Sequence, residues 1–409
     1  MTPFLQLISL LAIILVAAKA AGYFSNRLGQ PSVLGELIAG VILGPALLDI
    51  LHWPIFTDLA LPETVDHLAE IGVLLLMFVA GLELHLSELV HNTKVSALGG
   101  ILGVLVPVAL GYGIGVAAGL SPQESFFLGL TLGATSVSIS AQTLMELGRL
   151  RSRVGLGLLG AAVFDDILVI FMLSGFLALV TGGGGLGTVG LLFLRMVLFL
   201  ALSAAFGWWV LPTLVRRTGR LPISQGVVTL ALVVLFVYGL AAEVVGSMAA
   251  ISGTFLAGLM FARSPEKERI EAGVHALAYS FFVPIFFISI GLAVDTRGMS
   301  LNLLWLFLGI TVAAIAGKLL GAGLGARLAG FTYRESAQLG AGMVSRGEVG
   351  LIIASVGIEQ GLVEQAEFSA IIGMVLVTTL ITPPMLRALV AEGAPARTSS
   401  PRVEIEEEV

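Results

Sequence analysis

The sequence has 409 residues, of which 57% are hydrophobic and only 12% are charged. Soluble domains carry about 25% charged residues, so a soluble or secreted enzyme is excluded and the surplus apolar surface must face lipid. The formal net charge of −6 argues against a nucleic-acid partner, and the lack of cysteine excludes disulfides, thiolate metal sites and a cysteine nucleophile.

A helix that crosses a membrane needs about 20 mostly apolar residues. Segments of about that length follow one another along the chain, and we expect each to be a helix. In chain order they cover residues 4–25, 33–51, 65–84, 94–119, 123–147, 153–180, 188–215, 221–241, 246–262, 274–294, 300–327, 334–358 and 365–390. The sequence therefore predicts an all-α, polytopic membrane protein with about 13 transmembrane helices.

The last residues differ in composition from the rest of the chain. After residue 391 the sequence becomes rich in Pro, Ser and Glu and ends in EIEEEV. We expect residues 1–391 to form a transmembrane domain and residues 392–409 to form a short, disordered, acidic cytoplasmic tail. Such a tail is too short to be a nucleotide-binding regulatory domain.

Basic residues in the loops indicate the orientation, because cytoplasmic loops carry an excess of Lys and Arg. With the N-terminus outside, only Arg297 falls in an outer loop. The basic residues that fall on the cytoplasmic side are Arg27, Lys94, Arg149, Arg151, Arg153, Arg216, Arg217, Arg220, Arg263, Lys267, Arg269, Arg327, Arg334, Arg387, Arg397 and Arg402. We therefore expect a multi-pass protein of the cell (inner) membrane with its N-terminus outside and its C-terminus in the cytoplasm.

Two adjacent aspartates, Asp165 and Asp166, lie near the centre of the sixth predicted helix. Ionisable residues at this depth are costly and are candidates for function. Neighbouring residues on a helix point about 100° apart, so one can line a water-filled cavity while the other turns to a neighbouring helix. A structural ion pair is the alternative reading. Lys318 and Arg346 also fall inside predicted helices and need partners within the protein.

Two predicted helices carry small and polar residues at mid-span. The fifth contains LGATSVSIS (132–140) and the twelfth contains LGAGMVSRGEVG (339–350). Unwound backbone is tolerated in a membrane only where it is covered by protein or lines water, and a pair of interrupted helices in corresponding halves marks the site of inverted-repeat transporters. We expect helices 4–6 and 11–13 to be the two repeats. Close packing of small residues is the alternative.

Seven motifs in order give the chain a family resemblance. They are QPSVLGELIAGVILGP (30–45), LLLMFVAGLEL (74–84), GATSVSIS (133–140), GAAVFDDIL (160–168), FFVPIFFISIGL (281–292), AGKLLGAG (316–323) and SRGEVGL (345–351). With them the chain resembles the monovalent cation:proton antiporters, a family that includes NapA-like and Kef-like proteins. The Asp-Asp pair is more similar to the NapA-like, Na⁺/H⁺-exchanging subgroup.

The resemblance implies the NhaA/NapA-like fold, in which two discontinuous helices cross. It implies a core at about 94–180 and 300–390, a dimerisation scaffold at about 4–51 and 188–262, a homodimer, and elevator-type movement of core against scaffold. It also implies that Asp166 binds the cation or the proton, and that Asp165 pairs with Lys318.

Other residues could complete such a site. Sodium prefers hard oxygen ligands, which Thr135, Ser136 and Ser138 could supply together with carbonyls freed at the helix break. Ser and Thr are also common in interhelical packing, so this assignment has a structural alternative. Arg346 and Glu348 are expected to balance the partial charges at the broken helix ends.

The leading hypothesis is a secondary antiporter that exchanges Na⁺ or Li⁺ for H⁺, with both ions competing for Asp166. The exchange would be electrogenic if protons also leave the Asp165–Lys318 pair. K⁺/H⁺ exchange on the same scaffold is the close alternative. A passive cation channel or a sensor without transport is less favoured. No enzyme motif such as HExxH is present, so we expect neither catalytic residues nor a cofactor.

Overall fold

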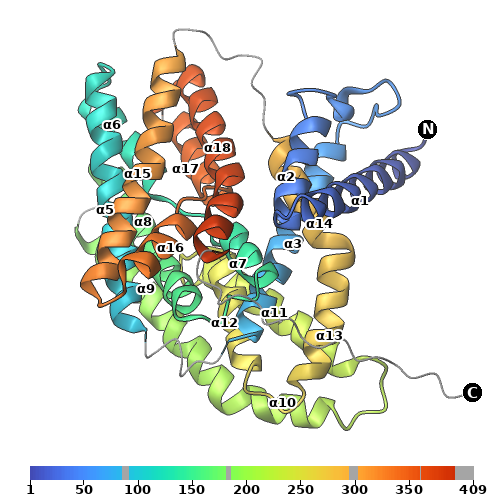
Figure 1. The fold of residues 1–409 in the computed structure, drawn as a ribbon. Helices are drawn as coiled ribbons and strands as arrows, with labels where there is room; N and C mark the ends of the chain where they lie inside the picture. Colours follow the sequence, from blue (N-terminus) through green and yellow to red (C-terminus); the bar gives the residue numbers. More distant parts are fainter. Residues whose placement is uncertain (85–91, 181–185, 294–302, 360, 392–409) are drawn as a thin grey trace, which may run out of the picture.

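The computed structural model describes the whole chain except residues 85–91, 181–185, 294–302, 360 and 392–409 (Figure 1). Every regular element in the described residues is a helix, which confirms the predicted all-α class. The predicted acidic tail, residues 392–409, lies outside the described part.

Nine helical segments among the described residues are long and apolar enough to cross a membrane. They are α1 (Pro3–Arg27), α3 (Leu61–Leu82), α5 (Thr93–Ala117), α8 (Arg153–Val180), α9 (Leu186–Ala205) with its extension α10 (Leu211–Thr218), α11 (Gly226–Val244), α13 (Lys267–Leu277) with its extension α14 (Val283–Leu292), α15 (Leu304–Leu328) and α18 (Gln365–Ala391). The extensions continue through short π-helical turns at Phe206–Val210 and Ala278–Phe282. The chain is therefore a multi-pass, helical membrane protein.

The remaining helices are shorter. They are α2 (Ser32–Leu43), α6 (Pro122–Gly133), α7 (Val137–Glu146), α12 (Ala250–Phe261), α16 (Tyr333–Gly342) and α17 (Glu348–Glu359). The predicted segment 33–51 is not one helix, because α2 ends at Leu43 and a single 3₁₀ turn follows at Ile50–His52. Gly44 is extended and precedes Pro45, and the residue before a proline disfavours helical backbone.

The helices pack into two groups, which we call the crossing bundle and the flanking bundle. The crossing bundle contains α5–α8 and α15–α18, with α5 packed between α6, α8 and α15. The flanking bundle contains α1–α3 and α9–α14, with α3 packed against α12 and α14. In Figure 1 most of the crossing bundle lies on one side and α1, α2 and α14 lie on the other, with α7 between them.

The first halves of the two predicted broken helices begin in the same way. Ser121 starts α6 and Thr332 starts α16, and each is followed three residues later by a glutamate that completes a capping box. In both boxes the backbone N–H of the cap residue donates to the glutamate at 2.8 Å. The internal repeat expected from the sequence stays a prediction.

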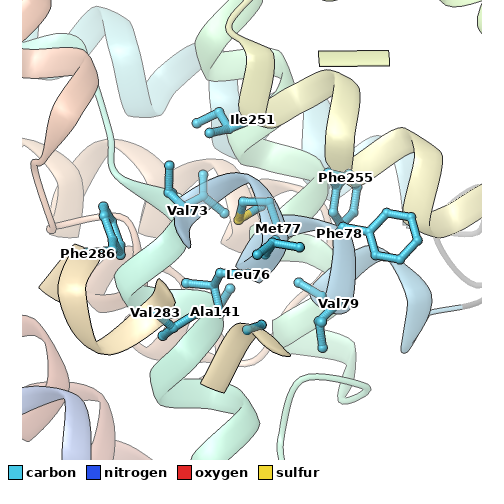
Figure 2. Packing of buried hydrophobic residues seen from close by; sticks show 14 of the residues in the cluster. Val73, Leu76, Met77, Phe78, Val79, Ala141, Ile251, Phe255, Val283 and Phe286 are labelled. Atoms are coloured by element: carbon cyan, nitrogen blue, oxygen red, sulfur yellow. The ribbon is translucent and has the colours of Figure 1, made fainter. Parts of the chain in front are cut away.

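The hydrophobic core is centred on α3, and Figure 2 shows part of it. Side chains of α3 meet others from α7, α12 and α14 there, so the core joins the flanking bundle to the crossing bundle. The labelled residues are Val73, Leu76, Met77, Phe78, Val79, Ala141, Ile251, Phe255, Val283 and Phe286. Outward-facing apolar side chains such as Val312, Leu320 and Leu328 on α15 remain exposed, as lipid contact requires.

Candidate functional site: crossed helix breaks beside two buried aspartates

Two of the predicted helices are interrupted. Residues 134–136 separate α6 from α7, and residues 343–347 separate α16 from α17. The two breaks meet, because the backbone N–H of Ser136 donates to the carbonyl oxygen of Ser345 at 2.8 Å. The structure therefore brings together the two polar stretches that the sequence singled out.

Serine hydroxyls hold the breaks together. Ser345 Oγ donates to the Ser136 carbonyl oxygen at 2.5 Å, and Ser140 Oγ donates to the Gly342 carbonyl oxygen at the same distance. Buried backbone groups that lose their helical partners are costly unless another group satisfies them. These hydroxyls supply partners for carbonyls that the interruptions release.

Arg346 lies at the break and is fully buried. Its Nη2 donates to the carbonyl oxygen of Leu132 at 2.6 Å, near the C-terminal end of α6, and its Nη1 donates to the carbonyl oxygen of Val344, just after α16. Helix C-termini carry partial negative charge, so the guanidinium lies between two such ends. Glu348 is the first residue of α17, but its side chain lies outside the described part of the structure.

Asp165 and Lys318 are in contact. Lys318 Nζ lies 2.7 Å from Asp165 Oδ1, and both side chains are 0% exposed. The contact joins α8 to α15, and α5 packs against both helices. The second oxygen, Asp165 Oδ2, has no hydrogen-bond partner within the described residues.

Glycines allow this close approach. At Gly321 and Gly325 of α15, an added Cβ would collide with the backbone of α5 at Leu102 and Leu98. At Gly100 of α5, it would meet the carbonyl oxygen of Ala161 in α8 at 2.6 Å. Small residues let membrane helices pack at short distances, which brings Lys318 within reach of Asp165.

Asp166 points to a different neighbourhood, at the boundary between the bundles. Its side chain is 5% exposed, and Ser252 Oγ of α12 donates to its Oδ2 at 2.8 Å. The separation agrees with the 100° between adjacent helical positions. Lys318 interacts electrostatically with both aspartates.

A small cavity of about 10 Å³ adjoins Asp166, and this is about the space of one water molecule. The crossing bundle contributes Val137, Leu159, Ala162, Val163 and Asp166 to its lining, and the flanking bundle contributes Met77, Ile251, Ser252 and Phe255. Asp166 and Ser252 are the only polar residues among these nine. The carboxylate is thus enclosed by mostly apolar walls.

The three hydroxyl residues proposed from the sequence are all buried at the break between α6 and α7. Ser136 Oγ and Ser138 Oγ lie 3.0 Å apart, and Thr135 Oγ1 has no hydrogen-bond partner in the described part of the chain. Val137, in the same stretch, lines the Asp166 cavity. A role in cation binding stays a prediction for each of the three.

Sequence reasoning missed Ser252. It lies in the apolar stretch AAISGTF together with Thr254, and small hydroxyl side chains are typical of ordinary helix packing. No feature of that stretch distinguishes it, because its importance comes only from its placement opposite Asp166.

Sequence reasoning also missed a second contact between the bundles, which Glu146 makes. Glu146, the last residue of α7, accepts hydrogen bonds from the backbone N–H and the hydroxyl of Ser32, each at 2.5 Å, and from the backbone N–H of Val33 at 3.3 Å. Ser32 and Val33 begin α2 of the flanking bundle. Glu146 therefore caps a helix of the other bundle, since unpaired N–H groups at a helix start need acceptors.

Two larger crevices border the boundary between the bundles. One, of about 640 Å³, is lined by polar residues beside this cap, including Asn26, Gln30, Glu146 and Arg387. The other, of about 460 Å³, includes Glu70, Glu243 and Ile251 in its lining, and Ile251 also lines the Asp166 cavity.

Comparison with known proteins places this chain in a family. A profile of the sodium/hydrogen exchanger transmembrane family matches residues 11–392. The Na⁺/H⁺–K⁺ antiporter GerN of Bacillus cereus is 43% identical over 377 residues, which cover 92% of this chain and 94% of that protein. A Na⁺/H⁺ antiporter of Enterococcus hirae is 35% identical over 385 residues, covering 94% of this chain and 98% of its own length.

The solved structure of the sodium proton antiporter MjNhaP1 from Methanocaldococcus jannaschii has a similar fold. It superimposes with a TM-score of 0.68 at 19% identity and covers 95% of this chain and 98% of its own. Crossed, interrupted helices beside buried charges define a secondary transporter. The chain belongs to the sodium/hydrogen exchanger family. It is a transporter of monovalent cations and protons, as its resemblance to the cation:proton antiporters predicted.

Proposed function

We propose that the protein exchanges Na⁺ or Li⁺ for H⁺ across the cell membrane, and that the two ions compete for Asp166. The observation that carries this proposal is the enclosed Asp166 carboxylate, at the boundary between two bundles and beside a cavity the size of one water molecule. A carboxylate binds either a proton or a cation at full strength, so occupation by one ion releases the other. Exchange needs no separate gate for each ion.

The cation has further ligands within reach of the same region. Hydroxyl and carbonyl oxygens suit a hard cation, and the break between α6 and α7 offers them at Thr135, Ser136 and Ser138. The unpartnered Thr135 Oγ1 supports a ligand role, because a buried hydroxyl without a partner is costly. Arg346 and Glu348 would balance the broken helix ends without contacting the ion.

K⁺/H⁺ exchange is the second candidate. The name of the Bacillus cereus relative includes K⁺ as well as Na⁺, and a carboxylate with hydroxyl ligands has no intrinsic preference strong enough to exclude the larger ion.

A vesicle assay tests the activity and ranks the ions. The purified protein is reconstituted with an imposed pH gradient, an acid-trapped fluorescent dye reports the gradient, and Na⁺, Li⁺ or K⁺ is added. We expect Na⁺ and Li⁺ to dissipate the gradient at lower concentrations than K⁺. Protein-free vesicles are the control. A gradient that collapses before any cation is added indicates a channel, and one that no cation changes contradicts exchange.

We also propose the arrangement of the chain in the membrane. The nine long segments, the two short apolar helices α2 and α12, and the two interrupted pairs make thirteen crossings if each spans the bilayer. The N-terminus is then outside and the C-terminus in the cytoplasm. The family resemblance implies a homodimer formed through the flanking bundle. Light scattering of the solubilised protein tests this, and a mass equal to that of one chain would contradict it.

The transport cycle moves the crossing bundle against the flanking bundle, as an elevator. Three features support this: the bundles meet at Asp166, the Glu70–Glu243 crevice shares Ile251 with its cavity, and Glu146 joins the bundles at the opposite, cytoplasmic end in the proposed orientation. We assign this conformation to an outward-facing or outward-occluded state, because the crevice on the outer side shares Ile251 with the Asp166 cavity. The larger crevice beside Glu146 shares no lining residue with that cavity.

A reversible cross-link tests the movement. Because the sequence contains no cysteine, the double variant Ser32→Cys/Glu146→Cys offers only the introduced thiols to a short, reducible bifunctional reagent. We expect the cross-link to stop exchange and reduction to restore it. The pair Arg153→Cys/Glu335→Cys, whose native side chains lie 3.7 Å apart within the crossing bundle, is the control and should keep its activity. Full exchange with the bundles cross-linked contradicts an elevator.

A further inference from the structure

The side chain that meets Asp166 from the other bundle is Ser252. Its hydroxyl donates to Asp166 Oδ2 at 2.8 Å, while the other flanking residues around the cavity, Met77, Ile251 and Phe255, are apolar. In surroundings of low polarity a hydrogen bond to a carboxylate has a larger effect than it has in water.

We propose that Ser252 is a positioning residue that favours the ionised Asp166 in this conformation and so sets how well the cation competes with the proton. The inference deepens the proposed function and rests on it. A hydrogen bond to the charged form of a group stabilises that form. A hydroxyl can also accept a bond from a protonated carboxyl, but the bond to a charged acceptor is the stronger one.

The placement makes this effect depend on conformation. Asp166 belongs to the crossing bundle and Ser252 to the flanking bundle. Movement of one bundle against the other separates the two side chains, so the hydroxyl acts on Asp166 on only one side of the cycle. The carboxylate would therefore hold its proton more weakly on the side where Ser252 reaches it, which favours proton release there.

Three charges of the crossing bundle do not change partners in this way. Asp165 precedes Asp166 on the same helix, Lys318 of α15 interacts with both aspartates, and Arg346 interacts with Asp165. All of them belong to the crossing bundle and move with Asp166. Ser252 comes from the flanking bundle, so its contact with Asp166 can differ between the two sides of the membrane.

Removal of the hydroxyl tests the proposal. In Ser252→Ala the proton is expected to compete more strongly, so at a fixed pH the apparent KM for Na⁺ rises about tenfold, which is the factor for one lost hydrogen bond to a charged group. The pH profile of exchange should move about one unit upward. The maximal rate at saturating Na⁺ and high pH should change much less than KM.

Two further variants separate positioning from packing. Ser252→Thr keeps the hydroxyl and should restore most of the wild-type KM and pH profile. Thr254→Val removes another buried hydroxyl of α12, which donates to the Ile251 carbonyl oxygen of its own helix, and should match wild type. If Ser252→Ala is not recovered from membranes, Ser252→Cys replaces it, because a thiol is a weak donor and should give a smaller shift in the same direction.

Each outcome bears on a different claim. Absence of exchange by the wild-type protein removes the proposed function itself. If the wild-type protein exchanges ions and Ser252→Ala has the same KM and pH profile, the role of Ser252 is overturned and the proposed function is not. Equal shifts in Ser252→Ala and Thr254→Val also overturn it, because they would show a general effect of loosening α12.

Discussion

Asp166→Asn is expected to abolish cation-dependent dissipation of the pH gradient, down to the level of protein-free vesicles. An amide cannot release a proton in the range where the carboxyl does, and it cannot neutralise a bound cation. The amide nearly matches the carboxylate in size, and its oxygen can still accept the bond from Ser252, so the fold should survive. The measurement is the dye assay with Na⁺, Li⁺ and K⁺ in turn.

The matched control for this variant is Asp66→Asn, the same substitution in α3 at an exposed position. It should exchange at the wild-type rate. A second readout is thermal stability with added Na⁺, because a ligand that binds only the folded state raises the unfolding temperature. We expect Na⁺ to stabilise the wild type and Asp66→Asn but not Asp166→Asn. Wild-type exchange by Asp166→Asn would remove Asp166 from the site.

Lys318→Gln is expected to destabilise the protein strongly, because it leaves Asp165 buried and charged without its partner. Breaking a fully buried ion pair costs about 3–5 kcal/mol, and both side chains here are 0% exposed at a separation of 2.7 Å. The loss is measured as a lower unfolding temperature of the solubilised protein. The double variant Asp165→Asn/Lys318→Gln removes both charges and should recover most of the lost stability.

Lys19→Gln provides the comparison for Lys318. Lys19 also pairs with a glutamate, Glu36, but at 3.8 Å and with a side chain that is 54% exposed. Only the lysine is exposed, because the Glu36 side chain is 7% exposed, so this variant should lose less stability than Lys318→Gln. Where Lys318→Gln survives reconstitution, we expect exchange without voltage dependence. Unchanged stability, rate and voltage dependence would show that the pair has neither role.

Much of the architecture follows from composition and span length, and the reasons are physical. Lipid demands long apolar segments with internally paired backbone, so the helical class and the approximate positions of the long helices can be read directly. The polar stretches at 132–140 and 339–350 indicated the breaks, because two such stretches in corresponding halves are typical of interrupted helices, although small residues also serve helix packing. The early end of α2 could also have been predicted from Gly44 and Pro45.

The parts of the site that could not be predicted are contacts between distant segments. Hydrophobic periodicity contains no information on which helix lies beside α8, so the pairing of Asp165 with Lys318 came from family resemblance and not from spacing. The contacts of Ser252 and Glu146 were not indicated even by the family resemblance. Ser252 is one of two small hydroxyl residues in an apolar helix, and Glu146 is an ordinary acid at a helix end until α2 is placed against it.

The crossing of the two breaks also determines when the site can form during synthesis. Ser136 and Ser345 are 209 residues apart, and Asp165 and Lys318 are 153 apart. Until α15, α16 and α17 have been inserted, the gap between α6 and α7 lacks its backbone partner and Asp165 lacks its cation. The growing chain therefore carries an incomplete and costly centre through most of its insertion, and the ion site is assembled among the last steps of folding.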